Sequence, residues 1–294
     1  MPYTGELSAL LTADFWSFSA VVFASATARA GAIPVNVARL VLAALYLALL
    51  LPVLGPGLRL SGAQVGLLAA SGVIGLAFGD SFLFKAFGEL GPRVTMLIMS
   101  TSPAFAACLA WVVLGERLSA RGLCGILITL AGVAVVVTGK PAGDHPRPAW
   151  RGIWWGVLAS VGQGSGLIFA KMAFNEGEIN GFMATLVRIL ASLVVMIPLG
   201  VAESKSTGAF GIFRKDPGSF GLTALGALLG PFLGISFSLI AIAHTDVGVA
   251  ATIMATVPIL MLPLVRIMYR EHLTPKAVGG AFLAVAGVAL LFLR

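Results

Sequence analysis

The chain carries little charge for its length. Only 11% of its 294 residues are charged, whereas 59% are hydrophobic. A soluble domain has roughly 25% charged residues, and a soluble fold of this size lacks the interior volume to hide so many apolar side chains. The composition therefore excludes an ordinary soluble domain and predicts a membrane protein.

Cysteine is almost missing as well. Cys108 and Cys124 both lie within apolar runs, and two thiols in such places form neither a disulfide framework nor a metal site. We interpret them as small buried hydrophobic side chains. A signal peptide's basic region is also absent, because the first Lys or Arg is Arg29. We expect the first helix to stay in the membrane.

Signatures of catalysis and of nucleic-acid binding are absent too. No Ser-His-Asp set or metal cluster occurs, and "GQGSG" at 162–166 lies inside an apolar run with no strand before it, unlike a phosphate-binding loop. The 19 basic residues outnumber the 12 acidic ones but are scattered singly, which favours contact with anionic lipid headgroups. We expect no enzyme activity, cofactor, metal or nucleic-acid partner.

Ten apolar runs are long enough to cross a bilayer, which takes about 20 residues of helix. Turn and cap residues separate them, with Ser119 and Thr274 at N-cap positions and Pro275 at a first helical position. Backbone polar groups in lipid must bond within the segment, so runs this long predict helices rather than a barrel. The expected spans are 6–28, 34–54, 62–88, 91–115, 119–138, 150–174, 179–202, 218–243, 246–270 and 274–293.

The second half of the chain repeats the first. At an offset of 155 residues, Glu116 of "GERLS" falls on Glu271 of "REHLT", and we interpret both as surface turns, with a gating contact as the alternative. The second spans align at an offset of 149, which places Arg39 on Arg188, and the first spans align at 146. Further matches at 155 place Gly75, Gly79, Ser81 and Phe82 on Gly230, Gly234, Ser236 and Phe237.

Five is an odd number of spans, so two tandem copies must lie in the membrane with opposite orientations. Many secondary transporters have this arrangement, with a site near the midplane between the repeats. The sequence therefore predicts an all-α polytopic membrane protein of ten transmembrane helices, built as two inverted five-helix repeats around a central cavity. The expected repeats are 1–140 and 150–294, joined by a linker at 141–149.

Each half has a proline in its fourth span, a Glu-containing turn and a glycine-rich fifth span, and the first span reads "ALLTADFWSFSAVVFAS". Over essentially the whole chain this resembles the EamA branch of the drug/metabolite transporter superfamily, and the layout is similar to the YddG-type amino-acid exporters. The resemblance implies a cavity lined by helices 1, 3, 4, 6, 8 and 9, and export of neutral or aromatic amino acids. The fourth span differs, because "MSTSP" stands where those exporters place bulky aromatic residues.

Several side chains deep in these spans are candidates for the cavity. A mid-span Trp16 wants a partner for its N–H, and the amide of Gln163 is costly in lipid without partners; core packing is the alternative for both. Phenylalanines offer apolar walls, although any one of eighteen could instead face the core or the lipid. The cavity candidates are Trp16, Phe78, Asp80, Ser100, Ser102, Gln163, Phe237 and Met254.

Asp80 is a carboxylate deep in the third span, and its counterpart at offset 155 is Ile235. An ionisable group there is a functional hypothesis by default: Asp80 could bind a substrate ammonium, carry a proton, or pair structurally with Lys85, Arg39 or Arg188. We interpret the two arginines as structural. Pro103 and Pro258 each remove a helix hydrogen bond at equivalent depths, so they are candidates for a hinge or gate.

We predict a secondary transporter that exports small metabolites, above all amino acids, by alternating access; the alternative is a drug, nucleotide-sugar or sugar-phosphate carrier. We expect a monomer that crosses a bacterial-type inner (plasma) membrane many times. The resemblance implies cytoplasmic termini. The positive-inside rule favours the opposite orientation, because five Lys or Arg residues fall on the side of the termini and eleven on the other. Both orientations stay open.

Overall fold

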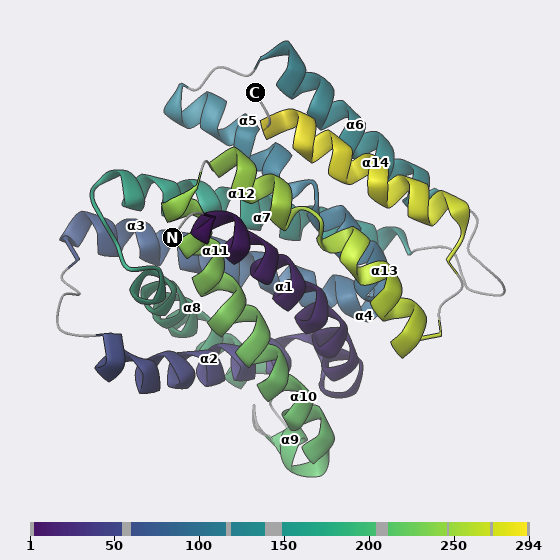
Figure 1. Cartoon of the computed structure of the whole chain (residues 1–294). Coiled ribbons are helices and arrows are strands. Elements are labelled where there is room, and N and C mark those ends of the chain that lie inside the picture. The colour runs from purple at the N-terminus through teal and green to yellow at the C-terminus, as the bar shows by residue number, and fades with distance from the viewer. Residues whose placement is uncertain are drawn as a thin grey trace.

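The computed structural model describes residues 3–54, 60–115, 119–138, 149–203, 211–245, 247–270 and 273–292. These residues form helices and connecting turns, without a strand (Figure 1). The helices are α1 Thr4–Ala30, α2 Ala32–Leu54, α3 Gly62–Gly72, α4 Asp80–Met99, α5 Ser102–Leu114, α6 Ala120–Val137, α7 Trp150–Asn175, α8 Gly181–Glu203, α9 Gly211–Lys215, α10 Pro217–Ala227, α11 Ile235–His244, α12 Val247–Met254, α13 Val257–Met268 and α14 Pro275–Phe292, with π-helical segments η1 Val73–Gly79 and η2 Leu228–Gly234. Apart from Ala149, the expected linker lies outside the described residues, as do the Glu116 and Glu271 turns.

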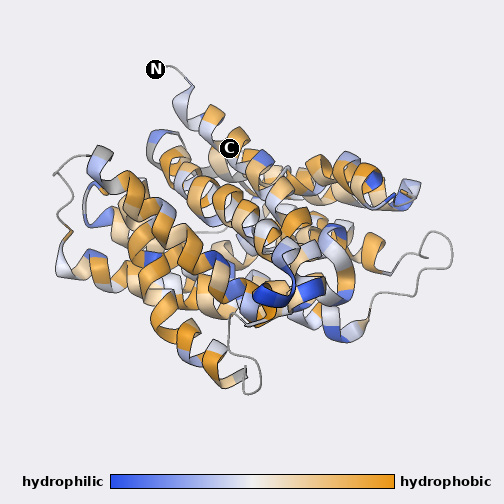
Figure 2. Cartoon of the chain, turned by 90° about the horizontal axis from the view of Figure 1, so that it is seen from below, coloured by the Kyte–Doolittle hydropathy of each residue, from blue (hydrophilic) through white to orange (hydrophobic). Residues whose placement is uncertain are grey.

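Seven helical segments among the described residues are long and apolar enough to cross a membrane, and three shorter helices are apolar too. Figure 2 shows hydrophobic residues along most of the helices. The chain is therefore an all-helical, multi-pass membrane protein. The seven segments are Thr4–Ala30, Ala32–Leu50, Gly62–Met99, Ala120–Val137, Trp150–Asn175, Gly181–Ala202 and Pro217–Ile242.

The helix boundaries recur at the offsets of the sequence matches. Moving η1 by 155 residues places it on η2, and the same shift places α3 on α10 and α6 on α14. A shift of 149 places α2 on α8. Because π-helical turns are rare in proteins, their occurrence at matching positions indicates that the two halves have the same local helix geometry.

Two expected spans are not continuous helices. The span expected at 91–115 is broken before α5, and the span expected at 246–270 is broken between α12 and α13. Pro103 and Pro258 lie in the first turn of the new helix in each case, where a missing N–H costs little. Both spans are therefore interrupted next to these prolines, and the expectation of continuous spans is wrong.

Local predictions in the fourth and fifth spans have different outcomes. Ser119 Oγ accepts a hydrogen bond from Gly122 N, and Thr274 Oγ1 accepts one from Ala277 N, both at 3.1 Å, so both N-caps are confirmed. The interpretation of the cysteines as buried is wrong. Cys108 on α5 and Cys124 on α6 are both exposed, because these helices lie at the periphery of the bundle, where an apolar thiol can face lipid.

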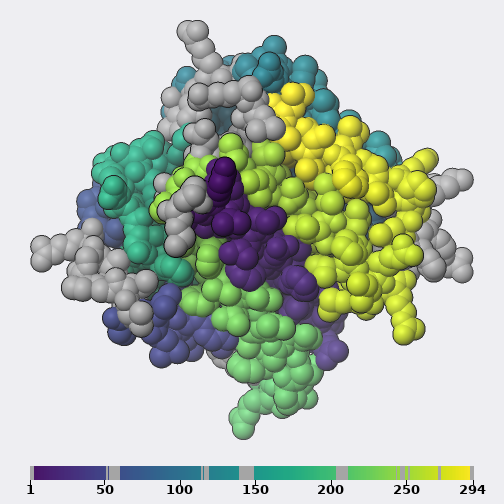
Figure 3. Space-filling view, in the orientation of Figure 1, coloured from purple at the N-terminus to yellow at the C-terminus, as the bar shows by residue number. Residues whose placement is uncertain are grey.

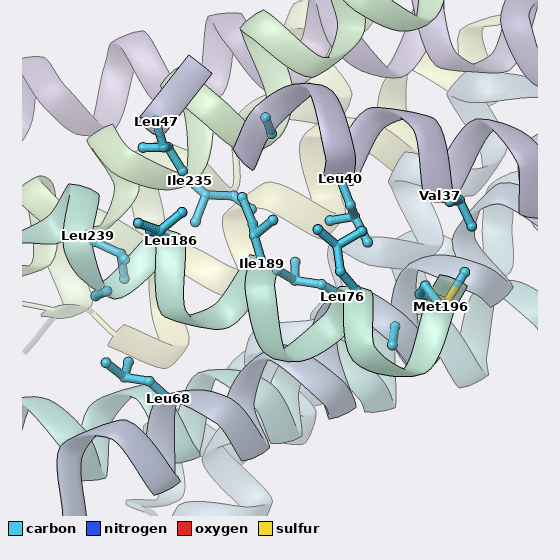
Figure 4. Close-up of a cluster of buried hydrophobic side chains, with 14 of the residues drawn as sticks. Val37, Leu40, Leu47, Leu68, Leu76, Leu186, Ile189, Met196, Ile235 and Leu239 are labelled. Atoms are coloured by element: carbon cyan, nitrogen blue, oxygen red, sulfur yellow. The ribbon is translucent and has the colours of Figure 1, made fainter. Parts of the chain in front are cut away.

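The main apolar core joins helices from both halves (Figure 4). Leu40 on α2, Leu76 in η1 and Leu68 on α3 pack in one cluster with Ile189 on α8 and Leu239 on α11. A core of this kind cannot be divided at the middle of the chain. The two halves therefore form one body.

The first helix of each half packs against the other half. Helix α1 lies against α10, η2 and α11, and α7 lies against α3, η1 and α4; Figure 3 shows α1 among second-half segments. Glycines permit both approaches. A Cβ on Gly162 would lie 2.6 Å from Gly79 Cα, and one on Gly234 would lie 2.6 Å from Trp16 Nε1. The offset of 146 places Trp16 on Gly162, and the offset of 155 places Gly79 on Gly234. The two contacts are therefore equivalent in the two halves.

Helices α6 and α14 lie side by side in an antiparallel pair (Figure 1). A Cβ on Gly125 would lie 2.6 Å from Leu291 N, and one on Gly132 would lie 2.5 Å from Ala284 N. Small residues let membrane helices approach this closely. The contact therefore depends on glycine at the seam.

The contact between α6 and α14 can be tested by substitution of two adjacent glycines of α14. A Cβ on Gly280 would lie 2.8 Å from Gly132 O, whereas one on Gly279 would meet nothing within 4 Å. We expect Gly280→Ala to lower the thermal unfolding midpoint of the detergent-solubilised protein, because overpacking costs about 1–3 kcal/mol. Gly279→Ala should leave the midpoint unchanged or raise it, since alanine is the better helix former. Equal midpoints for the two variants would contradict the assignment.

Candidate functional site

A cavity of about 1740 Å³ lies between the two halves. At one end its lining includes Asn175 at the end of α7, His244 at the end of α11 and Ser119 before α6, and all three are exposed. The start of α1 lies at this same end, because Thr245 Oγ1 donates a hydrogen bond to Glu6 Oε1 at 3.0 Å. The cavity therefore reaches the surface at the end of the bundle where α1 begins.

Aromatic rings close the cavity toward the opposite end. The rings of Phe23 and Phe84 meet edge to face with centroids 5.1 Å apart, and those of Phe84 and Phe87 are 5.8 Å apart. All three side chains are buried. The guanidinium of Arg39 lies 5.0 Å from the Phe84 ring centroid and 5.7 Å from that of Phe23, so cation–π contacts hold this aromatic floor beside the charged groups.

Asp80 begins α4 directly after η1, and it is only 2% exposed. Its Oδ2 accepts a hydrogen bond from Arg39 Nη2, and its Oδ1 accepts one from Gln163 Nε2 at 2.8 Å. Arg39 Nε in turn donates to Asn36 Oδ1 at 2.9 Å. A buried carboxylate needs such partners, so one polar network joins α2, α4 and α7 at the cavity wall.

The cations proposed as partners of Asp80 have different positions. Arg39 forms the ion pair. Lys85 points elsewhere, with its Nζ 5.0 Å from the Trp155 ring centroid. Arg188 lines the cavity without a salt bridge to Asp80.

The structure brings most of the candidate residues to one cavity. Phe78 and Phe237 lie apart from it: Phe78 is 48% exposed and packs against Phe82 at 4.6 Å, and Phe237 packs against Phe15 at 6.0 Å. Their positions in and after the π-helical segments turn them away from the residues that line the cavity. The candidates in the lining are Trp16, Asp80, Ser100, Ser102, Pro103, Gln163, Met254 and Pro258.

Sequence reasoning missed the aromatic floor. Phe84 and Phe87 follow Asp80 by four and seven residues on the same helix, and this spacing places all three on one helix face. Listing the residues that share a helix face with Asp80 would have identified both phenylalanines. It also missed that Arg39 and Arg188 both line the cavity.

The ion pair can be tested by a double-mutant cycle. We expect Asp80→Asn or Arg39→Gln alone to cost about 3–5 kcal/mol, since each leaves the partner charge buried and unpaired. The double variant Asp80→Asn/Arg39→Gln should cost less than the sum, measured as thermal unfolding of the full chain in detergent. Purely additive losses would show that the two side chains do not interact.

Comparison with known proteins agrees with this architecture. The model of the EamA-like transporter family matches residues 3–138 and 150–293. The chain is 21% identical over 287 residues to an uncharacterized transporter from Archaeoglobus fulgidus, covering 98% of this chain and 97% of that protein. A solved crystal structure aligns with a TM-score of 0.67 at 19% identity over 98% of each chain, which shows a shared fold. The chain therefore belongs to the EamA-like transporter family and is a multi-pass membrane transporter of small substrates, not an enzyme.

Proposed function

We propose that the chain is an amino-acid exporter of the YddG type, which carries neutral or aromatic amino acids across the membrane by alternating access. The single observation behind this proposal is the cavity: its lining is mostly apolar, and away from its open end it presents a polar group at Asp80 and Gln163. An apolar wall with few polar anchors suits a zwitterion with an apolar side chain. Trp16 offers a ring surface on which such a side chain can stack.

The proposal includes ten membrane crossings arranged as two inverted five-helix repeats, 1–140 and 150–294. Kinks support this count: α4 bends at Gly91, whose φ is 72°, so its two parts can belong to successive crossings. The antiparallel seam supports the inversion, because Gly125 approaches Gly287 O and Gly132 approaches Gly280 O. The offset of 155 exchanges these two contacts, as a two-fold axis in the membrane plane would.

The correspondence between the two halves also supports alternating access. The floor residues Phe84 and Phe87 correspond at offset 155 to Leu239 and Ile242, which line the cavity on the way to its open end. If each half adopts the conformation that the other half has here, Leu239 and Ile242 come together and close one end of the cavity. The aromatic floor then separates and opens the other end. The breaks before Pro103 and Pro258 supply bending points at equivalent depths.

Counterflow in proteoliposomes tests transport. Vesicles that contain the full chain and are loaded with unlabelled L-phenylalanine should accumulate external labelled L-phenylalanine, and protein-free vesicles should not. Trp16→Ala should lower this exchange about tenfold, because it removes a cavity wall. Trp111→Ala, at an outward-facing side chain 57% exposed, should leave it unchanged. Absence of exchange for every neutral and aromatic amino acid would remove the substrate assignment.

We further propose a monomer in a bacterial-type inner membrane with cytoplasmic termini. The orientation needs its own test because the distribution of Lys and Arg favours the reverse. His244 lies at the end of the bundle where α1 begins. Arg214 lies at the other end, since α9 directly precedes α10 and a Cβ on Gly218 of α10 would lie 3.3 Å from Arg29 Nη1 at the end of α1.

In a background with Cys108→Ala and Cys124→Ala, single cysteines can report this orientation. A membrane-impermeant thiol reagent added to intact cells should label Arg214→Cys, and it should label His244→Cys only after lysis. The opposite pattern would place the termini outside and agree with the charge distribution.

A further inference from the structure

One buried cation in the cavity, Arg188, forms no salt bridge with any of the residues that the structure describes. Arg188 on α8 is only 6% exposed and lines the cavity. Its Nε has no hydrogen-bond partner among the residues that the structure describes. Burying an unpaired guanidinium is costly. Such a group within a membrane protein indicates a binding function rather than a structural one.

The first half shows what Arg188 lacks. Arg39 corresponds to Arg188 at the offset of 149, and its carboxylate partner is Asp80. The residue that corresponds to Asp80 is Ile235, which also lines the cavity but has no polar side-chain atom. The second half therefore has the arginine of the pair but an aliphatic side chain in place of the carboxylate.

Asp80 does not compensate both arginines. Its two oxygens are taken by Arg39 and Gln163, although it lies within electrostatic range of Arg188. Two guanidinium groups and one carboxylate leave one positive charge beside the Asp80 network. A transported solute that carries one negative group would balance it.

Glycines of the first half make room for this side chain. A Cβ on Gly72 would overlap the main chain of Arg188, so α8 crosses α3 at very close range. A Cβ on Gly75 would lie 3.4 Å from Arg188 Nη2 and 3.5 Å from Gln163 Oε1. The guanidinium and the Gln163 amide therefore lie on the same side of η1, next to the Asp80 network.

We propose that Arg188 binds the anionic oxygens of the transported solute, and that these are the carboxylate oxygens of an amino acid. This rests on the proposed function. A planar guanidinium donates two parallel hydrogen bonds to a carboxylate, so it fixes the orientation of the solute as well as its charge. The solute carboxylate takes the place that Asp80 occupies beside Arg39. A phosphate presents similar oxygens, so the test must separate the two anions.

The test measures ligand-induced shifts of the thermal unfolding midpoint of the purified full chain, at a series of probe concentrations. The probes are L-phenylalanine, L-phenylalaninamide, which lacks the carboxylate, and inorganic phosphate. We expect L-phenylalanine to bind the wild-type chain and the amide to bind about tenfold more weakly or not at all, because one charged hydrogen bond is worth about that factor.

Three variants assign the effect to Arg188. Arg188→Gln should weaken L-phenylalanine binding about tenfold or more, and Arg188→Lys should recover part of it. Ile235→Asp should weaken it as well, because it restores an internal carboxylate that competes with the solute. Arg266→Gln removes the same charge at an exposed position on α13 and should leave binding unchanged.

The outcomes separate this inference from the proposed function. L-Phenylalanine binding to Arg188→Gln within about twofold of wild type would overturn the carboxylate site, even if counterflow of amino acids is intact. Binding of phosphate but not L-phenylalanine, lost in Arg188→Gln, would support an anion site and refute its assignment to an amino-acid carboxylate. If no anionic probe binds the wild-type chain, the inference is wrong.

Discussion

A buried carboxylate must be neutralised inside the protein, because the surrounding lipid offers no counter-ion, and the centre of this molecule is arranged around that constraint. Asp80 is held by Arg39 from α2 and by Gln163 from α7. The same arginine lies over the rings of Phe23 and Phe84, which belong to the floor of the cavity. The ion pair thus joins α2 and α4 of the first half, and the Gln163 hydrogen bond adds α7 of the second half, so one polar network connects both halves beside the cavity floor.

Much of the architecture could be predicted from the sequence. Hydrophobic runs and turn chemistry located the helices, and the matches at 146, 149 and 155 anticipated the coincidence of α2 with α8 and of α6 with α14. The π-helical segments could not be predicted, because they lie where parts of the chain that are distant in sequence pack closely, Gly79 against Gly162 and Gly234 against Trp16. Trp16 and Gln163 line the cavity as expected, whereas Phe78 and Phe237 do not.

The proposed binding of a solute carboxylate depends on where the two halves differ. Arg39 and Arg188 recur, but Asp80 is matched by Ile235. Equal halves could in principle bind equally and independently. With an aliphatic side chain at the position of the carboxylate in one half, there is a polar network on one wall and, nearby, a guanidinium whose Nε has no hydrogen-bond partner among the described residues. A symmetric fold can thereby provide an asymmetric site, which is what an orienting interaction with a dipolar solute requires.

Each half packs its first helix against the other half, and this packing has a consequence for biosynthesis. Thr12 of α1 donates a hydrogen bond to the Gly234 carbonyl, 222 residues further along the chain. At about 5–20 residues per second, this partner leaves the ribosome roughly 10–45 s after α1. During this interval α1, with Ser8, Thr12 and Ser17 on its buried face, must rest against lipid, earlier helices or the insertion machinery. A chain stopped after its first half would therefore expose the face of α1 that is buried in the full protein, and cellular quality control could recognise it.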